Sequence, residues 1–296
     1  MVLFSNLAYN YWCKNKIYGI NNLNNFKEYF LSFIDNSFNT SSMKIYSIQD
    51  VNISESSINN INLLLCVENT KFHRHYNFIN KFGHFNKNIQ IYLYNTYSNF
   101  VESEEYIIIP VIYLQCDYFL KNYDKIYPSI HTNFTDKKFC IQVSFLKYKT
   151  EYYDLINNNI KKINSIGHID NLNNYKIKIE NDSCYHSNNL LNLLNNYKFI
   201  ICFENSFTNG YITEKIFNAF FSRSIPIYIG PKDTCKYIDN NSYLNLIDID
   251  VPLIKKLSEN EVMFNSFIKN IKIKNYNNEN YVIKSQNFIN KITNNK

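Results

Sequence analysis

The stretch from Tyr197 to Pro231 constrains the fold more than any other part of this chain. Residues 199–203 form a short apolar run rich in β-branched and aromatic side chains, which is typical of a buried strand. From Thr213 onward, apolar residues recur at helical spacing, at Ile216, Phe217, Phe220 and Phe221. A second apolar run at 225–229 ends before Gly230. This order predicts a βαβ unit with a parallel sheet and a right-handed crossover.

The loop between the first strand and the helix is rich in polar residues. It carries Glu204, Asn205, Tyr211, Thr213, Glu214 and Lys215. Ligands of open α/β sheets bind beyond the carboxyl ends of the strands, where helix N-termini favour anions. A cation suits a diphosphate, a carboxylate suits ribose hydroxyls, and an amide with an aromatic ring suits a base or sugar. The same residue types also cap loops and helices, so the residues alone leave both interpretations open.

This stretch resembles the donor-binding signature of the α-1,3/1,4-fucosyltransferases of glycosyltransferase family 10. The matching positions are Tyr197, Lys198, Phe199, Phe203, Glu204, Asn205, Tyr211, Thr213, Glu214, Lys215, Ala219, Pro226 and Gly230. The resemblance implies an α/β fold of the GT-B type, with two Rossmann-like domains facing each other across a cleft. It also implies inverting transfer of L-fucose from GDP-β-L-fucose to a glycan hydroxyl, such as O3 of N-acetylglucosamine, forming an α-linkage.

The resemblance also implies roles for the residues of this loop. Lys215 is predicted to stabilise the departing diphosphate, and Glu214 is predicted to accept hydrogen bonds from ribose hydroxyls. The other predicted donor-binding residues of the loop are Glu204, Asn205, Tyr211 and Thr213. No cofactor is required in this scheme.

Residues 1–130 are predicted to form the first, acceptor-side domain, with strands near 2–9, 43–48 and 61–67. The last of these strands is followed by Glu68. It resembles the family's strand that ends in a Gly-Glu-Asn turn, with Val67 in place of the Gly. The resemblance implies that Glu68 is the catalytic base, while a solvated carboxylate at a strand end is the alternative.

Residues 138–265 are predicted to form the donor-binding domain, after a polar, turn-rich linker at 121–136. Counting back from Tyr152 and Tyr153 places Lys149 where relatives have an Arg that pairs with the donor diphosphate. Lys keeps the positive charge and loses the bidentate fork. The alternative for Lys149 is a surface charge at a helix N-terminus. The segment at 266–296 is expected to be a C-terminal helix and tail, for which packing back on the first domain is one option.

Composition excludes several classes of protein. A length of 296 residues suggests about two domains, and a net charge of +6 from scattered Lys residues does not make a nucleic-acid-binding stripe. Seven Cys without a CxxC pair favour a reducing compartment. No signal peptide or long apolar segment stands out, so a cytoplasmic enzyme without a membrane span is expected. The oligomeric state stays open.

Two short patterns resemble metal sites. His73 and His75 form an HxH pair, and Asp248 and Asp250 form a DxD pattern. No carboxylate or Cys at useful spacing completes a ligand set around the His pair, which instead suits a polar insertion. The Asp pair follows a strand-like run and matches a structural position of the family. The sequence therefore predicts no metal requirement.

Two alternative hypotheses about the function remain. One is a GT-B transferase that uses another nucleotide sugar, although retaining members space their paired Glu more closely than Glu204 and Glu214. The other is a carbohydrate- or nucleotide-binding relative with weakened catalysis. It is motivated by three departures from the family pattern, at Val67, Ile108 and Lys149.

Overall fold

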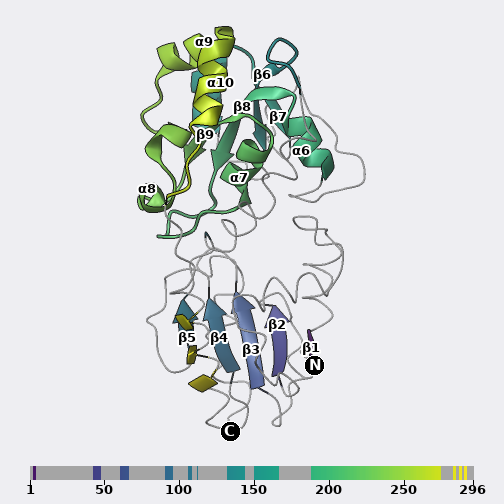
Figure 1. The fold of residues 1–296 in the computed structure, drawn as a ribbon, viewed down its shortest axis with the longest axis vertical. Helices are drawn as coiled ribbons and strands as arrows, with labels where there is room; N and C mark the ends of the chain where they lie inside the picture. The colour runs from purple at the N-terminus through teal and green to yellow at the C-terminus, as the bar shows by residue number, and fades with distance from the viewer. Residues whose placement is uncertain are drawn as a thin grey trace. The chain divides into compact units, whose positions relative to one another are not determined.

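The structure of this chain is a computed structural model. It describes residues 3–4, 43–47, 61–66, 91–95, 106–108, 112, 132–143, 150–166, 188–274, 283–284, 287–288 and 290–291. The chain divides into two compact units. The first comprises Met1–Tyr113, Thr208–Tyr211 and Asn277–Lys296, and the second comprises Leu114–Phe207 and Ile212–Tyr276. Each unit contains one five-stranded parallel sheet, which confirms the predicted α/β class (Figure 1).

The sheet of the first unit follows chain order. Its strands are β1 (Leu3–Phe4), β2 (Met43–Ser47), β3 (Ile61–Cys66), β4 (Ile91–Asn95) and β5 (Tyr106–Ile108), and neighbours pair in parallel. The predicted strands at 43–48 and 61–67 are therefore confirmed, each ending one residue early. Near-continuous apolar runs such as that of β3 are typical of strands in parallel sheets, which are covered on both faces. Glu68, His73 and His75 lie outside the described residues.

The sheet of the second unit has a crossed strand order. Its strands are β6 (Lys138–Val143), β7 (Asn164–Ile166), β8 (Tyr197–Phe203), β9 (Ile225–Ile229) and β10 (Leu244–Asn245), in the spatial order β10-β9-β8-β6-β7. β8 is central and pairs in parallel with β6 and β9. The predicted βαβ unit is thus confirmed as β8, α7 (Glu214–Phe221) and β9.

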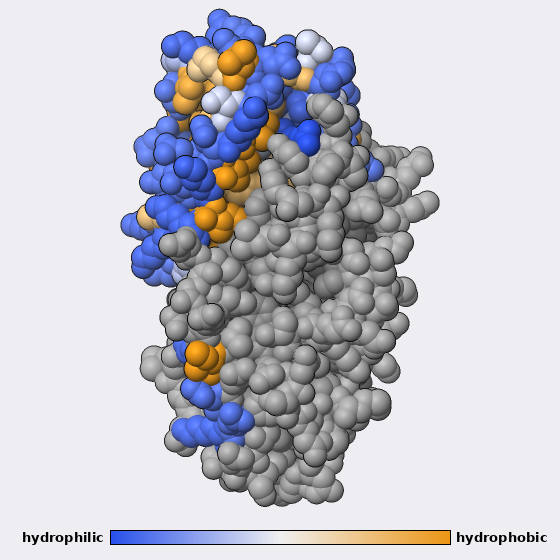
Figure 2. All heavy atoms as spheres, in the orientation of Figure 1, coloured by the Kyte–Doolittle hydropathy of each residue, from blue (hydrophilic) through white to orange (hydrophobic). Residues whose placement is uncertain are grey.

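Helices flank this second sheet. They are α5 (Thr150–Asn159), α6 (Asn188–Leu194), α7, α8 (Thr234–Tyr237), α9 (Val251–Glu259) and α10 (Glu261–Lys269), with a 3-10 turn η5 (Asn240–Ser242). Because side chains alternate along a strand, Phe199 and Ile201 of β8 point to one face, where they join a buried core with Phe264 of α10. Hydrophilic residues cover much of the described surface of this unit in Figure 2.

Tilted and edge-on aromatic pairs join α10 to β8 and to the turn before β6. The ring of Phe264 lies 5.2 Å from the ring of Phe134 and 6.4 Å from the ring of Phe199, measured between centroids. Such pairs add about 0.5–1.5 kcal/mol each beyond burial alone. Within the described residues, no helix has both the length and the apolar character that crossing a membrane requires.

Lys137, just before β6, is a buried cation surrounded by acceptors. Its Nζ donates to the carbonyl and side-chain oxygens of Asn195 and, at 3.4 Å each, to the carbonyl oxygens of Tyr197 and Ser222. Burial, together with the positive charges of Arg223 and Lys198, lowers the pKa of Lys137 from 10.5 to about 7. Lys137 therefore connects three segments of the backbone, which follow α6, begin β8 and follow α7.

This environment predicts a pH-dependent stability. The unfolded chain holds the Lys137 proton up to about pH 10.5, whereas the folded chain releases it near pH 7. The free energy of unfolding should therefore rise with pH, by roughly 1–2 kcal/mol between about pH 6.5 and about pH 8.5. Urea denaturation at the two pH values measures this slope.

Lys137→Met should remove that slope and, at the higher pH, destabilise the protein by about 1–3 kcal/mol because several carbonyls lose a donor. Lys162→Met, at an exposed lysine of the same unit, is the matched control. An unchanged pH slope in Lys137→Met would contradict this account.

Candidate functional site

The loop from Glu204 to Lys215 lies at the carboxyl edge of the second sheet. β8 ends at Phe203 and β9 ends at Ile229. The backbone N–H of Glu204 donates to the carbonyl of Ile229 at 3.0 Å, so the pairing of the two strands continues into the loop. α7 then begins at Glu214. The placement predicted from sequence, between a strand end and a helix N-terminus, is confirmed.

The carboxylate of Glu204 is the centre of this loop. One oxygen, Oε1, accepts from the backbone N–H of Thr213 at 2.8 Å and from the Tyr228 hydroxyl at 3.3 Å. The other, Oε2, accepts from the Thr213 hydroxyl at 2.7 Å and from Lys215 Nζ at 3.2 Å. Glu204 is 1% exposed. A carboxylate has about four acceptor sites, and four protein donors use them.

Thr213 joins Glu204 to the start of α7. Its backbone is extended, and its side chain makes no capping hydrogen bond to the helix. Its hydroxyl donates to Glu204 and accepts from Lys215 Nζ at 3.0 Å. Thr213 therefore does not cap the helix with its side chain, which was the alternative interpretation of this loop from sequence. Instead, it fixes the helix start against a buried charge.

Lys215 is the cation of the loop. Its Nζ lies 3.2 Å from the Glu204 carboxylate and 3.6 Å from the Glu214 carboxylate. The exposed fraction of the Lys215 side chain is 20%, compared with 15% for Glu214 and 0% for Glu204. Lys215 thus forms a salt bridge with a buried carboxylate, while part of its own side chain stays exposed to solvent.

Tyr228 belongs to the same network, and sequence reasoning missed it. It is 2% exposed, and its ring packs edge-on against that of Tyr243 at 5.5 Å. Burial raises the pKa of Tyr228 well above its ordinary value, and the negative charge of Glu204 raises it further. The hydroxyl therefore keeps its proton and donates to Glu204. The only sequence signal for this role is a Tyr inside an otherwise aliphatic strand.

Gly230 leaves room for the Tyr228 ring. A Cβ atom built on Gly230 would lie 2.1 Å from the Tyr228 hydroxyl oxygen and 2.4 Å from Cζ of the ring. Both distances are far shorter than van der Waals contact. A side chain at position 230 would therefore force a buried aromatic ring away from Glu204.

Gly230→Ala should consequently destabilise the second unit by about 1–3 kcal/mol, the usual cost of overpacking. Urea denaturation measures the loss. The same substitution made in a Tyr228→Leu background should cost much less, because the ring that it strikes is gone. Equal costs in the two backgrounds would show that Tyr228 is not the obstacle.

Cys202, at the end of β8, contacts the same helix. Its Sγ lies 3.3 Å from the carbonyl oxygen of Lys215. Burial raises the pKa of the Cys202 thiol well above its ordinary value, and the charge of Glu204 adds to the effect. Cys202 therefore stays a protonated, structural thiol, as expected for Cys in apolar runs.

The other predicted residues of this loop differ in exposure. Asn205 is exposed, whereas Tyr211 is 2% exposed and follows a turn closed by its N–H donating to Thr208. Gly210 occupies this turn with a φ of 76°, a backbone conformation that favours glycine. Lys149 lies outside the described residues, so its role stays a prediction.

The DxD pattern has a structural explanation. The Asp250 carboxylate accepts from the backbone N–H of Leu253 at 2.9 Å and caps α9. The Asp248 carboxylate accepts from the Asn245 side chain at 3.4 Å. Across the part of the chain that the structure describes, no three His, Cys, Asp or Glu side chains gather as a metal site would require.

Several known proteins resemble this chain in sequence. It is 35% identical over 100 residues to the alpha-(1,3)-fucosyltransferase FucT of Helicobacter pylori, covering 34% of this chain and 19% of that protein. It is 33% identical over 86 residues to 4-galactosyl-N-acetylglucosaminide 3-alpha-L-fucosyltransferase 9 of mouse and of human, covering 27% of this chain and 24% of each relative. The matched part is therefore a quarter or less of each relative.

Solved structures resemble the chain over a greater length. A crystal structure of an alpha1,3-fucosyltransferase with GDP-fucose matches with a TM-score of 0.56 and 19% identity, covering 98% of this chain and 89% of that one. The corresponding structure with GDP matches with a TM-score of 0.57 and 18% identity. At this identity, the similarity shows a shared fold. The GT-B placement of the two units stays a prediction.

A family model extends the comparison across the second unit. The model described as glycosyltransferase family 10 (fucosyltransferase) C-term matches residues 133–292. The match covers more than half of the chain and includes β6 to α10 with the whole Glu204–Lys215 loop. This chain therefore belongs to glycosyltransferase family 10, the fucosyltransferases.

Proposed function

We propose that this chain is an inverting α-1,3-fucosyltransferase that moves L-fucose from GDP-β-L-fucose to a hydroxyl of a glycan acceptor. The observation that carries the proposal is the ammonium of Lys215, held at the start of α7 by Glu204 and Thr213. Family membership supports the same reaction. The names of the relatives support O3 of N-acetylglucosamine as the acceptor position.

In this proposal, the second unit binds the donor. Lys215 and the N-terminus of α7 contact the diphosphate, where positive charge and backbone donors favour an anion. Lys149 adds a second cation, and the partly exposed Glu214 accepts from ribose hydroxyls. Asn205, which is exposed, lines the nucleotide pocket. The donor contact of Tyr211 stays a prediction, since its side chain is 2% exposed.

Glu204 takes an indirect role in the proposal. Sequence reasoning assigned it to direct donor contact, which stays an untested prediction. Its carboxylate is buried and already accepts from Thr213, Lys215 and Tyr228. These contacts favour a positioning residue that holds Lys215 and the start of α7 in place before the donor arrives. Such preorganisation removes the cost of reorienting a charge during the reaction.

The reaction proceeds as a single displacement. The acceptor oxygen bonds to the anomeric carbon of fucose from the face opposite GDP, and the bond from that carbon to the phosphate oxygen breaks. Glu68 takes the hydroxyl proton, so the base must lie within hydrogen-bond reach of the acceptor. The electron pair leaves with GDP, whose growing negative charge Lys215 and Lys149 stabilise. The linkage thereby changes from β to α.

Nucleotide selectivity tests this function directly. GDP at about 100 times its Kd should add about 2.7 kcal/mol to the free energy of unfolding and raise the Tm, because it binds only the folded chain. UDP at the same concentration should add much less. A thermal-shift titration measures both. A larger shift with UDP would favour the transferase that uses another nucleotide sugar and would exclude the fucosyl donor.

A further inference from the structure

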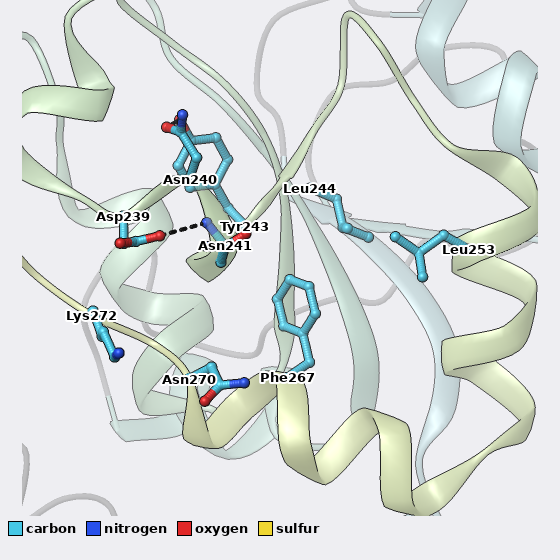
Figure 3. A pocket seen from close by; sticks show the side chains of 9 residues that line it. All are labelled: Asp239, Asn240, Asn241, Tyr243, Leu244, Leu253, Phe267, Asn270 and Lys272. Carbon is cyan, nitrogen blue, oxygen red and sulfur yellow. Dashed lines mark hydrogen bonds between the residues drawn. The ribbon is translucent and has the colours of Figure 1, made fainter.

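A cavity lies in the second unit and shares no lining residue with the loop at 204–215. Its volume is about 550 Å³, within the range of ligand sites. It lies between η5 and β10 on one side and α9, α10 and the segment after α10 on the other (Figure 3). It is therefore a candidate for a separate ligand.

The floor of this cavity is apolar. In Figure 3, Leu244 and Leu253 point toward one another above the ring of Phe267. Leu253 and Phe267 are half-buried, so part of their apolar surface stays open. A ring of this kind packs against the C–H face of a ligand that has one apolar side.

Neutral hydrogen-bonding groups surround this floor. Asn240, Asn241 and Asn270 are exposed, and each carboxamide offers both donors and an acceptor. The Tyr243 hydroxyl donates to the Asn240 side-chain oxygen at 3.3 Å, which orients one amide at the cavity wall. Groups that both donate and accept match hydroxyls, which do the same.

The charged side chains that line the cavity sum to zero net charge. Its charged lining residues are Asp239 and Lys272, one of each sign. The Asp239 carboxylate already accepts from the backbone N–H of Asn241 at 2.9 Å and thereby shapes the η5 turn. A polyanion would meet one cation beside one anion, so this cavity offers it no net positive charge. The lining thus favours an uncharged ligand with many hydroxyls and one apolar face.

We propose that this cavity is a second, non-catalytic site that binds an uncharged saccharide. The choice of saccharide class rests on the proposed function, since a glycan acceptor brings neutral sugar units to the protein. The site would retain one part of a glycan chain on the second unit, apart from the donor loop.

Methyl NMR of the full chain tests the site. Leucine methyl-labelled protein is titrated with galactosyl-N-acetylglucosamine, N-acetylglucosamine and galactose, and the signals of Leu244 and Leu253 report the cavity. At least one sugar should shift both signals in a saturable manner. The double variant Asn241→Ala, Asn270→Ala should weaken this binding by about tenfold, through the loss of two amide contacts. Asn265→Ala, an exposed amide of α10 outside this cavity, is the control.

The outcomes separate this proposal from the proposed function. Saturable shifts that the double variant weakens support the site, whatever GDP does. No sugar-induced shift, or wild-type affinity in the double variant, overturns it, even where GDP stabilises the protein. GDP or inorganic phosphate shifting the same two signals also overturns it, because the cavity would then be an anion site. GDP failing to bind while the sugars do contradicts only the fucosyltransferase proposal.

Discussion

Lys215→Met is expected to lower kcat/KM for fucosyl transfer by about 10²–10³-fold, the usual effect of removing one group that stabilises developing charge. It should also weaken GDP binding, because the ammonium contacts the diphosphate in the ground state as well. The physical reason is the position of Nζ, held 3.2 Å from a buried carboxylate and 3.0 Å from the Thr213 hydroxyl. Initial rates with GDP-fucose and calorimetric titration with GDP measure the two losses.

The variant needs a stability control, because Glu204 loses one of its four donors in Lys215→Met. The Tm of the variant shows whether the fold survives, and rates are compared below it. Lys232→Met is the matched charge control, since Lys232 is exposed just after β9 and Gly230. It should change neither quantity by more than about twofold, as expected for an exposed charge. Wild-type GDP affinity in a folded Lys215→Met protein would contradict the donor site.

Glu68→Gln is the second large prediction. The amide keeps the size of the side chain and cannot take a proton, so transfer should fall by about 10²–10⁴-fold. GDP affinity should stay nearly unchanged, because the base acts on the acceptor. Single-turnover transfer and GDP titration separate the two. The acidic limb of the pH profile of kcat/KM, which reports the free base, should also disappear.

A matched carboxylate supports the assignment of the base. Glu102→Gln changes another carboxylate in the first 130 residues, one without a proposed role, and should transfer fucose at the wild-type rate. Transfer by Glu68→Gln at the rate of this control would show that another group takes the proton. Loss of GDP binding in Glu68→Gln would instead point to a structural role.

Local sequence pattern was sufficient to predict the elements around the Glu204–Lys215 loop. The apolar run of β8, the helical spacing of α7 and the apolar run of β9 are each encoded within a few residues, so their type and order were predictable. The strands β2 and β3 were predictable for the same reason. The loop residues from Glu204 to Lys215 were predictable as a group, because strand ends and helix starts bring them to one sheet edge.

The roles inside that group depend on contacts between distant parts of the chain. Sequence spacing placed Glu204 among the donor ligands, and only the structure shows its carboxylate occupied by Tyr228, 24 positions away on the next strand. The burial of Lys137 likewise depends on acceptors 58 to 85 positions away. Such contacts follow from strand order in the sheet, which periodicity does not contain.

By itself, the sequence determined the α/β class, the family and the place of the Glu204–Lys215 loop between a strand and a helix, because each follows from short-range pattern and spacing. Only the tertiary structure decided which of those side chains is buried and which still reaches solvent. Burial depends on which side chains the neighbouring strand and helix place around a residue. For this reason the Glu204 carboxylate is desolvated and holds its neighbours in place, whereas Lys215 stays partly exposed to solvent.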